Sequence, residues 1–120
     1  MAKIIAVVNQ KGGVGKTTTA VNLTAALTAA GARVLLCDFD PQANATSGFG
    51  IEKRNTANTV YDMVINGVIP EQCVLRTKFG DVIPSGAELA GASVELIGLE
   101  HREYRLKDCL GKLRYAYDYI

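Results

Sequence analysis

The chain has 120 residues, of which 48% are apolar and 21% are charged, and 13 Lys+Arg residues against 12 Asp+Glu residues give a net charge of +1. This balance is typical of one globular domain, excludes a collagen-like or disordered chain, and gives no electrostatic indication of a nucleic-acid partner. The apolar runs are far shorter than the roughly 18 residues that a membrane span requires, so we expect a cytoplasmic protein.

The first predicted elements form a β-α-β unit. Residues 4–8 are apolar without alternation, which is typical of a strand covered on both faces in a parallel sheet. A helix is predicted over residues 16–30, because apolar residues recur at helical spacing from Ala20 to Ala30 and Gly31 can end it. Residues 34–37 are a second unalternated apolar run and predict the second strand.

The rest of the chain predicts short elements. In chain order they are a loop with one helical turn at 44–50, a helix at 60–65 capped by Thr59 and ended by Gly67, short extended segments at 68–84, helical stretches at 89–99 and 106–113, and the start of a strand at 115–120. An apolar strand that begins at the last residue is an unusual end for a domain. We therefore expect residues 1–120 to be the N-terminal portion of one larger domain.

A glycine-rich segment, Lys11-Gly12-Gly13-Val14-Gly15-Lys16-Thr17-Thr18, joins the first predicted strand to the first helix. Backbone N–H groups of such a turn can converge on phosphate oxygens, and the following helix adds its positive N-terminal end. In a P-loop, Lys16 would reach the β- and γ-phosphates and the Thr17 hydroxyl would ligate Mg²⁺.

The match to the P-loop pattern is a variant, because Gln10 stands where the usual pattern has its first glycine. Two other interpretations compete with it. The segment can be a tight turn without a ligand, or the turn of a dinucleotide-binding fold. Thr18 stands where the dinucleotide pattern has its third glycine, and the Lys16-Thr17 pair has no role there.

Two carboxylates, Asp38 and Asp40, follow the second predicted strand. Loops after parallel strands open at the edge of the sheet where ligands bind, so both should lie beside the glycine-rich segment. The alternative is a purely structural role, since aspartate often caps loops and turns.

These segments together resemble one family. Lys11 to Thr18 resembles the deviant Walker A motif, and Asp38 to Thr46 resembles the switch segment of the ParA/Soj chromosome and plasmid partitioning ATPases. The segments at 89–96 and 102–106 also look like that family, so the resemblance covers nearly all of the chain. It implies an α/β P-loop NTPase with a mostly parallel β-sheet flanked by helices, here without the Walker B strand expected after Ile120.

The resemblance also implies roles for individual residues, with ATP and Mg²⁺ as cofactors. Lys11 would reach across an ATP-bound dimer to the partner's phosphates and assist hydrolysis, and Asp40 would position the attacking water. Thr17 would bind the metal, and Asp38 would act on the metal's water shell. The nucleotide-binding residues would be Lys11, Gly12, Gly13, Val14, Gly15, Lys16, Thr17 and Thr18.

The function implied by the resemblance is an ATPase that dimerises with ATP and acts in chromosome or plasmid segregation. Its partners would be a ParB-like centromere-binding protein and non-specific DNA, at the nucleoid in the cytoplasm and without a membrane. The DNA-binding surface would lie beyond Ile120. We therefore expect the 120 residues alone to be unstable or aggregation-prone and to hydrolyse ATP weakly or not at all.

Three alternatives remain. A MinD-type membrane-associated ATPase of cell-division site placement shares Lys11 and Lys16, although Asp40-Pro41-Gln42 followed by Asn44 favours the ParA type. An iron–sulfur ATPase related to nitrogenase reductase would need cluster cysteines, but Cys37, Cys73 and Cys109 lie at no ligand-like spacing and are predicted to be small buried hydrophobes. The third alternative is an inactive fragment.

Overall fold

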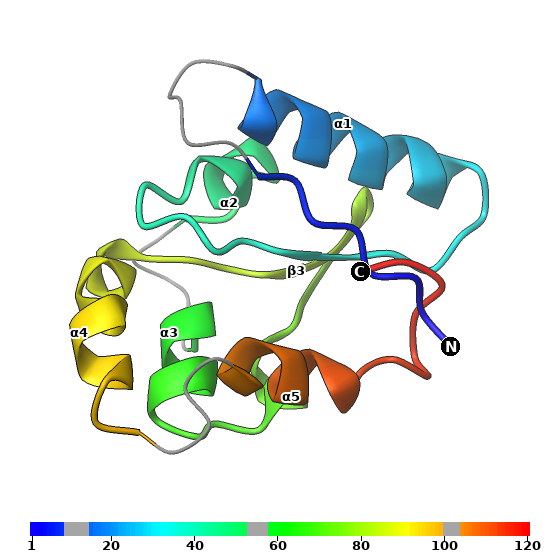
Figure 1. The fold of residues 1–120 in the computed structure, drawn as a ribbon. Coiled ribbons are helices and arrows are strands. Elements are labelled where there is room, and N and C mark those ends of the chain that lie inside the picture. Colours follow the sequence, from blue (N-terminus) through cyan, green and yellow to red (C-terminus); the bar gives the residue numbers. More distant parts are fainter. Residues whose placement is uncertain (9–14, 53–57, 100–103) are drawn as a thin grey trace.

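The computed structural model describes residues 1–8, 15–52, 58–99 and 104–120, and Figure 1 shows that they form three layers. Helices α1 and α2 cover one face of a small sheet, and α3, α4 and α5 cover the other. The elements are α1 (Lys16–Ala29), β1 (Leu35–Cys37), α2 (Asn44–Gly48), α3 (Val60–Ile65), the 3-10 helix Pro70–Cys73, β2 (Leu75–Thr77), β3 (Gly80–Ile83), the 3-10 helix Ala87–Gly91, α4 (Ala92–Leu96) and α5 (Arg105–Gly111).

The sheet has the strand order β1-β3-β2. β1 and β3 are parallel, with Leu36 opposite Val82, whereas β2 and β3 form an antiparallel pair. The fold is α/β as predicted, and the pairings of β1 with β3 and of Tyr119 with Lys3 and Val34 are parallel, as the expectation of a mostly parallel sheet requires. The antiparallel exception is β2, because residues 75–83 fold back as a hairpin, which only antiparallel strands can form with a short turn.

Alternation along β1 and β3 divides the core into two parts. Leu35 and Ile83 point toward α3 and α5 and belong to the larger apolar cluster. Leu36 and Val82 point the other way, onto Ala45 and the α1 side chains. Both faces of the central strand pair are therefore covered, as the unalternated apolar run at 34–37 predicts.

Local signals place the helix ends correctly. Gly15 and Gly31, with φ of 84° and 95°, bracket α1, close to the predicted bounds of 16–30. At the start of α3 the Thr59 N–H donates to the Asp62 carboxylate at 2.9 Å, and Gly67 follows the helix with φ of 70°. These caps satisfy backbone groups that a helix leaves unpaired at its ends.

Most other predicted elements are also present. The turn at 44–50 is α2, and the extended stretch at 68–84 holds β2 and β3, together with a 3-10 helix that the sequence did not predict. The helical stretch predicted at 89–99 is divided into a 3-10 helix and α4. The stretch predicted at 106–113 corresponds to α5.

The strand predicted at residues 4–8 is absent from this described segment, which is the main correction to the fold. Only Lys3 forms a β-bridge there, and the apolar side chains that follow are largely exposed, with Val8 82% accessible. The expectation that this segment is covered on both faces was wrong. A strand is stabilised by its neighbours, and within the described residues a partner lies beside only its first part.

That partner is the C-terminal segment. Tyr119 bridges in parallel both to Lys3 and to Val34, so residues 118–120 lie between the N-terminal segment and the start of β1. The Ile5 N–H donates to the Ile120 carbonyl at 2.8 Å, and the Leu35 N–H donates to the Tyr119 carbonyl at 3.0 Å. Of the strand predicted to begin at residues 115–120, the structure has only the β-bridges of Tyr119, since residues 115 and 116 lie in a turn. Figure 1 shows the C-terminus beside the N-terminal segment.

None of the helices among the described residues combines the length and the hydrophobicity needed to cross a membrane.

Candidate functional site

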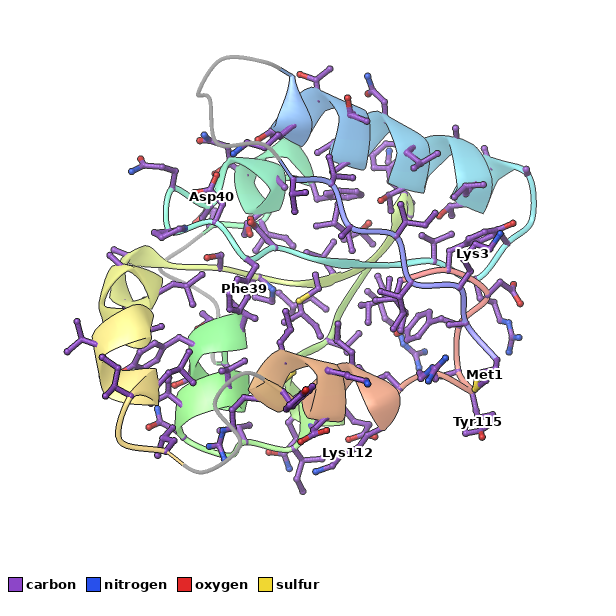
Figure 2. All side chains as sticks on the ribbon, in the orientation of Figure 1. Met1, Lys3, Phe39, Asp40, Lys112 and Tyr115 are labelled. Carbon is purple, nitrogen blue, oxygen red and sulfur yellow. The ribbon has the colours of Figure 1, made fainter. Side chains whose placement is uncertain are left out.

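A cavity of about 600 Å³ lies between α1 and the strands, and its two ends differ in chemistry. The apolar end is lined by residues 4–8, by Leu23 and Leu27 of α1, and by β1. Lys16, Thr17, Asp38 and Asp40 line the polar end. In Figure 2, Asp40 lies on the side where α1 begins.

The start of α1 has the features of an anion-binding helix N-terminus. Gly15 precedes the helix with φ of 84° and ψ of 17°, a left-handed conformation that a residue with a Cβ adopts only with strain. The 14-residue helix has no acidic side chain in its first turn, so its N–H groups and positive end are not neutralised from within. Lys16 and Thr17 are half-buried at this end. These residues fit a phosphate group and a hydroxyl-bound metal ion.

Asp38 follows β1 and is only 4% exposed. Its Oδ1 accepts the Asp40 N–H at 3.1 Å, and its Oδ2 accepts the Thr46 N–H at 2.9 Å and the Thr46 hydroxyl at 2.6 Å. A buried carboxylate needs such donors, because its desolvation is otherwise costly. Asp38 therefore holds the loop between β1 and α2 together.

Asp40 is more exposed than Asp38 and closes a turn within the same loop. Its Oδ1 accepts the Gln42 N–H at 3.0 Å, and its backbone carbonyl accepts the Ala43 N–H at 2.9 Å and the Ser85 hydroxyl at 2.6 Å. Both carboxylates thus have the structural role that the sequence left open as an alternative. This role does not exclude a chemical one, since Asp40 also lines the cavity.

The structure brings part of the predicted site together. Lys16 and Thr17 come from α1, Asp38 and Asp40 come from the following loop, and all four line one cavity. The predictions for Lys11, Gly12, Gly13 and Val14 lie outside the described residues. Sequence reasoning gave no role to Thr46 or Ser85, although both are buried beside Asp38. Thr46 and Ser85 are 39 positions apart, and the sequence between them carries no spacing signal for their contact.

The cysteines are free and lie in or against the core, as predicted. Burial raises the pKa of the Cys37 thiol to about 12 and that of Cys73 to about 11, so both stay protonated at neutral pH. Over the described ranges, no three His, Cys, Asp or Glu side chains are grouped as metal ligands would be.

A second hollow, of about 640 Å³, lies between the N-terminal residues and α5. Its lining includes Met1, Lys107 and Arg114, and none of the predicted site residues. We therefore place the candidate site at the start of α1.

Comparison with known proteins gives consistent matches along the whole chain. A family model described as an AAA domain matches residues 2–120. Soj of Bacillus subtilis strain 168, named a sporulation initiation inhibitor protein, is 52% identical over 100% of this chain and 48% of its own length. The chromosome partitioning protein ParA of Myxococcus xanthus is 46% identical over 100% of this chain and 43% of its own length.

Among solved structures, cobyrinic acid a,c-diamide synthase from Mycobacterium smegmatis with bound ADP and magnesium superposes with a TM-score of 0.94 at 41% identity. The match covers 99% of this chain and 49% of that one. The chain thus spans about half the length of the curated relatives it matches.

Proposed function

The chain belongs to the AAA domain family and, within it, to the ParA/Soj group of partitioning ATPases, and from this membership we propose that it binds ATP with Mg²⁺ and hydrolyses ATP in chromosome or plasmid partition. The observation that carries the proposal is the polar end of the cavity. There Lys16 and Thr17, at the start of α1, line the same cavity as Asp38 and Asp40.

The chemistry of these residues suits phosphoryl transfer, which asks of a protein mainly positioning and charge. Lys16 and the N–H groups at the start of α1 would hold the phosphates, and the Thr17 hydroxyl would hold the metal. Bound Mg²⁺ would neutralise charge that develops on the phosphate oxygens. Asp40 would orient the attacking water, and Lys11 would contribute a further positive charge.

The finer parts of the proposal come from the family resemblance. We propose that the ATP-bound form is a dimer in which Lys11 reaches the partner's phosphates. In this form it would bind non-specific DNA at the nucleoid and respond to a ParB-like protein. The ParA-type segment Asp40-Pro41-Gln42 supports this reading over a MinD-type membrane ATPase.

The Mycobacterium smegmatis neighbour is named for a different reaction, yet its structure holds ADP and magnesium. Because this neighbour has the same fold as the chain, its bound ligands support nucleotide and Mg²⁺ binding by the chain. The identities of 52% and 46% to Soj and ParA exceed its 41% and favour partition as the process served.

Nucleotide titration tests the site. Lys16→Ala removes the charge at the start of α1 and should weaken ATP binding by at least tenfold, the scale of one lost charge-assisted contact of about 1.5–3 kcal/mol. Lys112→Ala is the matched control, because this exposed lysine follows α5, which lies on the opposite face of the sheet from α1 (Figure 2).

Equal ATP affinity in the wild type and Lys16→Ala would overturn the nucleotide site. Hydrolysis is measured in the same samples. The weak turnover expected for residues 1–120 alone stays a prediction, and turnover comparable to that of a full-length relative would contradict it.

A further inference from the structure

Four residues from three parts of the chain form a closed ring of hydrogen bonds beside the candidate site. Asp38 and Asp40 follow β1, Thr46 lies in α2, and Ser85 follows β3. Thr46 and Ser85 are 0% and 1% exposed. Polar side chains are buried to this extent only when they have partners, so the ring is a structural feature and not an incidental surface contact.

One side of the ring anchors α2. The residue before this helix, Ala43, has a left-handed backbone with φ of 54° and no polar side chain that could cap it. Asp38, which lies outside the helix, provides the acceptor that a capping side chain would otherwise provide. Its Oδ2 accepts the Thr46 N–H in the first turn of α2. A carboxylate at this position also interacts favourably with the positive end of the helix.

The Thr46 hydroxyl connects this anchor to the turn after β3. It donates to the Asp38 carboxylate at 2.6 Å and accepts the Ser85 N–H at 3.0 Å. A hydroxyl can do both at once, whereas a methyl group of the same shape can do neither. Thr46 therefore joins two segments that are 39 residues apart.

Ser85 closes the ring on Asp40. Its hydroxyl donates to the Asp40 carbonyl at 2.6 Å, and the Asp40 N–H returns to Asp38 at 3.1 Å. The peptide groups on both sides of the Asp40 Cα are thus held by the ring. These two contacts fix the direction of the Asp40 Cα–Cβ bond, and the Gln42 N–H, which donates to Oδ1 at 3.0 Å, holds the carboxylate at the end of it.

We propose that Thr46 and Ser85 are positioning residues that fix the backbone of Asp40, and through it the carboxylate that faces the cavity. The proposal rests on the proposed ATPase function and deepens it, because it assigns the placement of the water-orienting group to two residues that need not touch the nucleotide. Misplacement of a reacting group by about 1 Å can lower a rate by roughly 100-fold.

The first test uses the full-length protein, not residues 1–120 alone, with Thr46→Val, which keeps the side-chain shape and removes the hydroxyl. We expect kcat for ATP hydrolysis to fall roughly 10- to 100-fold, while the KM and the Kd for ATP stay within about twofold. Thr46→Ser restores the hydroxyl and should recover most of kcat. Ser47→Ala is the matched control, since the Ser47 hydroxyl donates to the Ala43 carbonyl and lies outside the ring.

The dependence of the rate on Mg²⁺ separates this role from a metal-binding one. A Thr46→Val protein with normal kcat at saturating Mg²⁺ but a raised Mg²⁺ requirement would overturn the proposal. A lowered kcat at every Mg²⁺ concentration supports it.

A second test needs no catalysis. Amide hydrogen exchange of the nucleotide-free protein should become at least tenfold faster over residues 39–47 in Thr46→Val, and remain unchanged in α3 and α5. Should Thr46→Val fail to fold, Ser85→Ala carries the test, because it removes only the contact to the Asp40 carbonyl. A wild type without hydrolysis would count against the proposed function, whereas unchanged exchange over 39–47 in Ser85→Ala would overturn the positioning role.

Discussion

Asp38 and Asp40 are separated by one residue but have different surroundings. Both line the cavity, but Asp38 is buried, and both of its oxygens accept hydrogen bonds from the loop, whereas Asp40 is half-buried. Figure 2 shows Asp40 beside the start of α1 and Phe39 on the side of α3. All three residues line the cavity, so burial and hydrogen bonding, rather than distance from the cavity, distinguish the two carboxylates.

Asp40 is best tested by a pair of variants. Asp40→Asn keeps an oxygen that can accept the Gln42 N–H, whereas Asp40→Ala removes it. If the negative charge orients the attacking water, both variants should lose ATP hydrolysis by at least 100-fold and persist as ATP-bound dimers, a scale typical of removing one group that acts in the transition state.

Light scattering after gel filtration with ATP measures the dimer, and phosphate release measures the rate. The Asn variant is the informative one, because its loop geometry is retained. A monomer under ATP, or wild-type turnover in Asp40→Asn, would contradict the role given to Asp40.

At the level of elements, α1 and β3 approach each other closely at Gly80. This glycine begins β3 with φ of 129°, and a Cβ at this position would lie 2.8 Å from Cγ2 of Thr24 in α1. Gly67, after α3, also has a positive φ of 70°, but its Cβ would meet open space. An alanine at Gly67 would therefore suffer backbone strain alone, whereas an alanine at Gly80 would suffer both backbone strain and a steric clash.

Gly80→Ala should lower the free energy of unfolding by about 2–4 kcal/mol, because strain and overpacking add. Gly67→Ala is the control and should cost only about 1 kcal/mol, from the left-handed backbone. Denaturant unfolding of the two variants measures the difference. Equal losses would mean that the contact between α1 and β3 is not tight.

At the level of the whole molecule, the C-terminal segment ties separate parts of the chain together. Residues 118–120 pair with the N-terminal segment on one side and with residues 33–35 on the other. The Tyr117 hydroxyl donates to the Asp81 carboxylate of β3 at 2.7 Å, and Arg33 forms a 3.0 Å ion pair with Asp118. The apolar end of the cavity is next to this junction, and the C-terminal segment forms part of its lining.

The Arg33 pair makes the junction sensitive to acid. Hydrogen bonds from the Arg33 side chain and N–H hold the pKa of Asp118 below its ordinary value of about 3.9. The folded state therefore favours the carboxylate more than the unfolded state does. This contribution to stability is present above pH 4 and is lost as the pH falls through the lowered pKa.

Asp118→Asn should lower Tm slightly at pH 7, and the difference from the wild type should shrink as the pH falls below 4. The effect is small because the pair is exposed, and 1 M salt should reduce it further. Asp108→Asn, on the exposed part of α5, is the control. A Tm difference that persists unchanged at pH 2 would show that the ion pair does not link the two segments.

Local features were predictable because neighbouring residues determine them. Helix α1 follows from its apolar spacing and from Gly15 and Gly31, and α3 follows from Thr59, Asp62 and Gly67. The glycine-rich segment and the two aspartates after β1 likewise predict a phosphate site from short-range pattern alone. These signals lie within a few residues of the structure they specify.

Contacts between distant segments were decided only by the tertiary structure. The sequence does not show that Thr46 joins Asp38 to Ser85, that residues 75–83 return as an antiparallel hairpin, or that Tyr119 lies between Lys3 and Val34. Residues 4–8 have the composition of a covered strand, yet their exposure depends on which segments lie beside them. Spacing along the chain encodes which face a residue occupies, whereas pairing across tens of residues is settled by packing and hydrogen bonding in three dimensions.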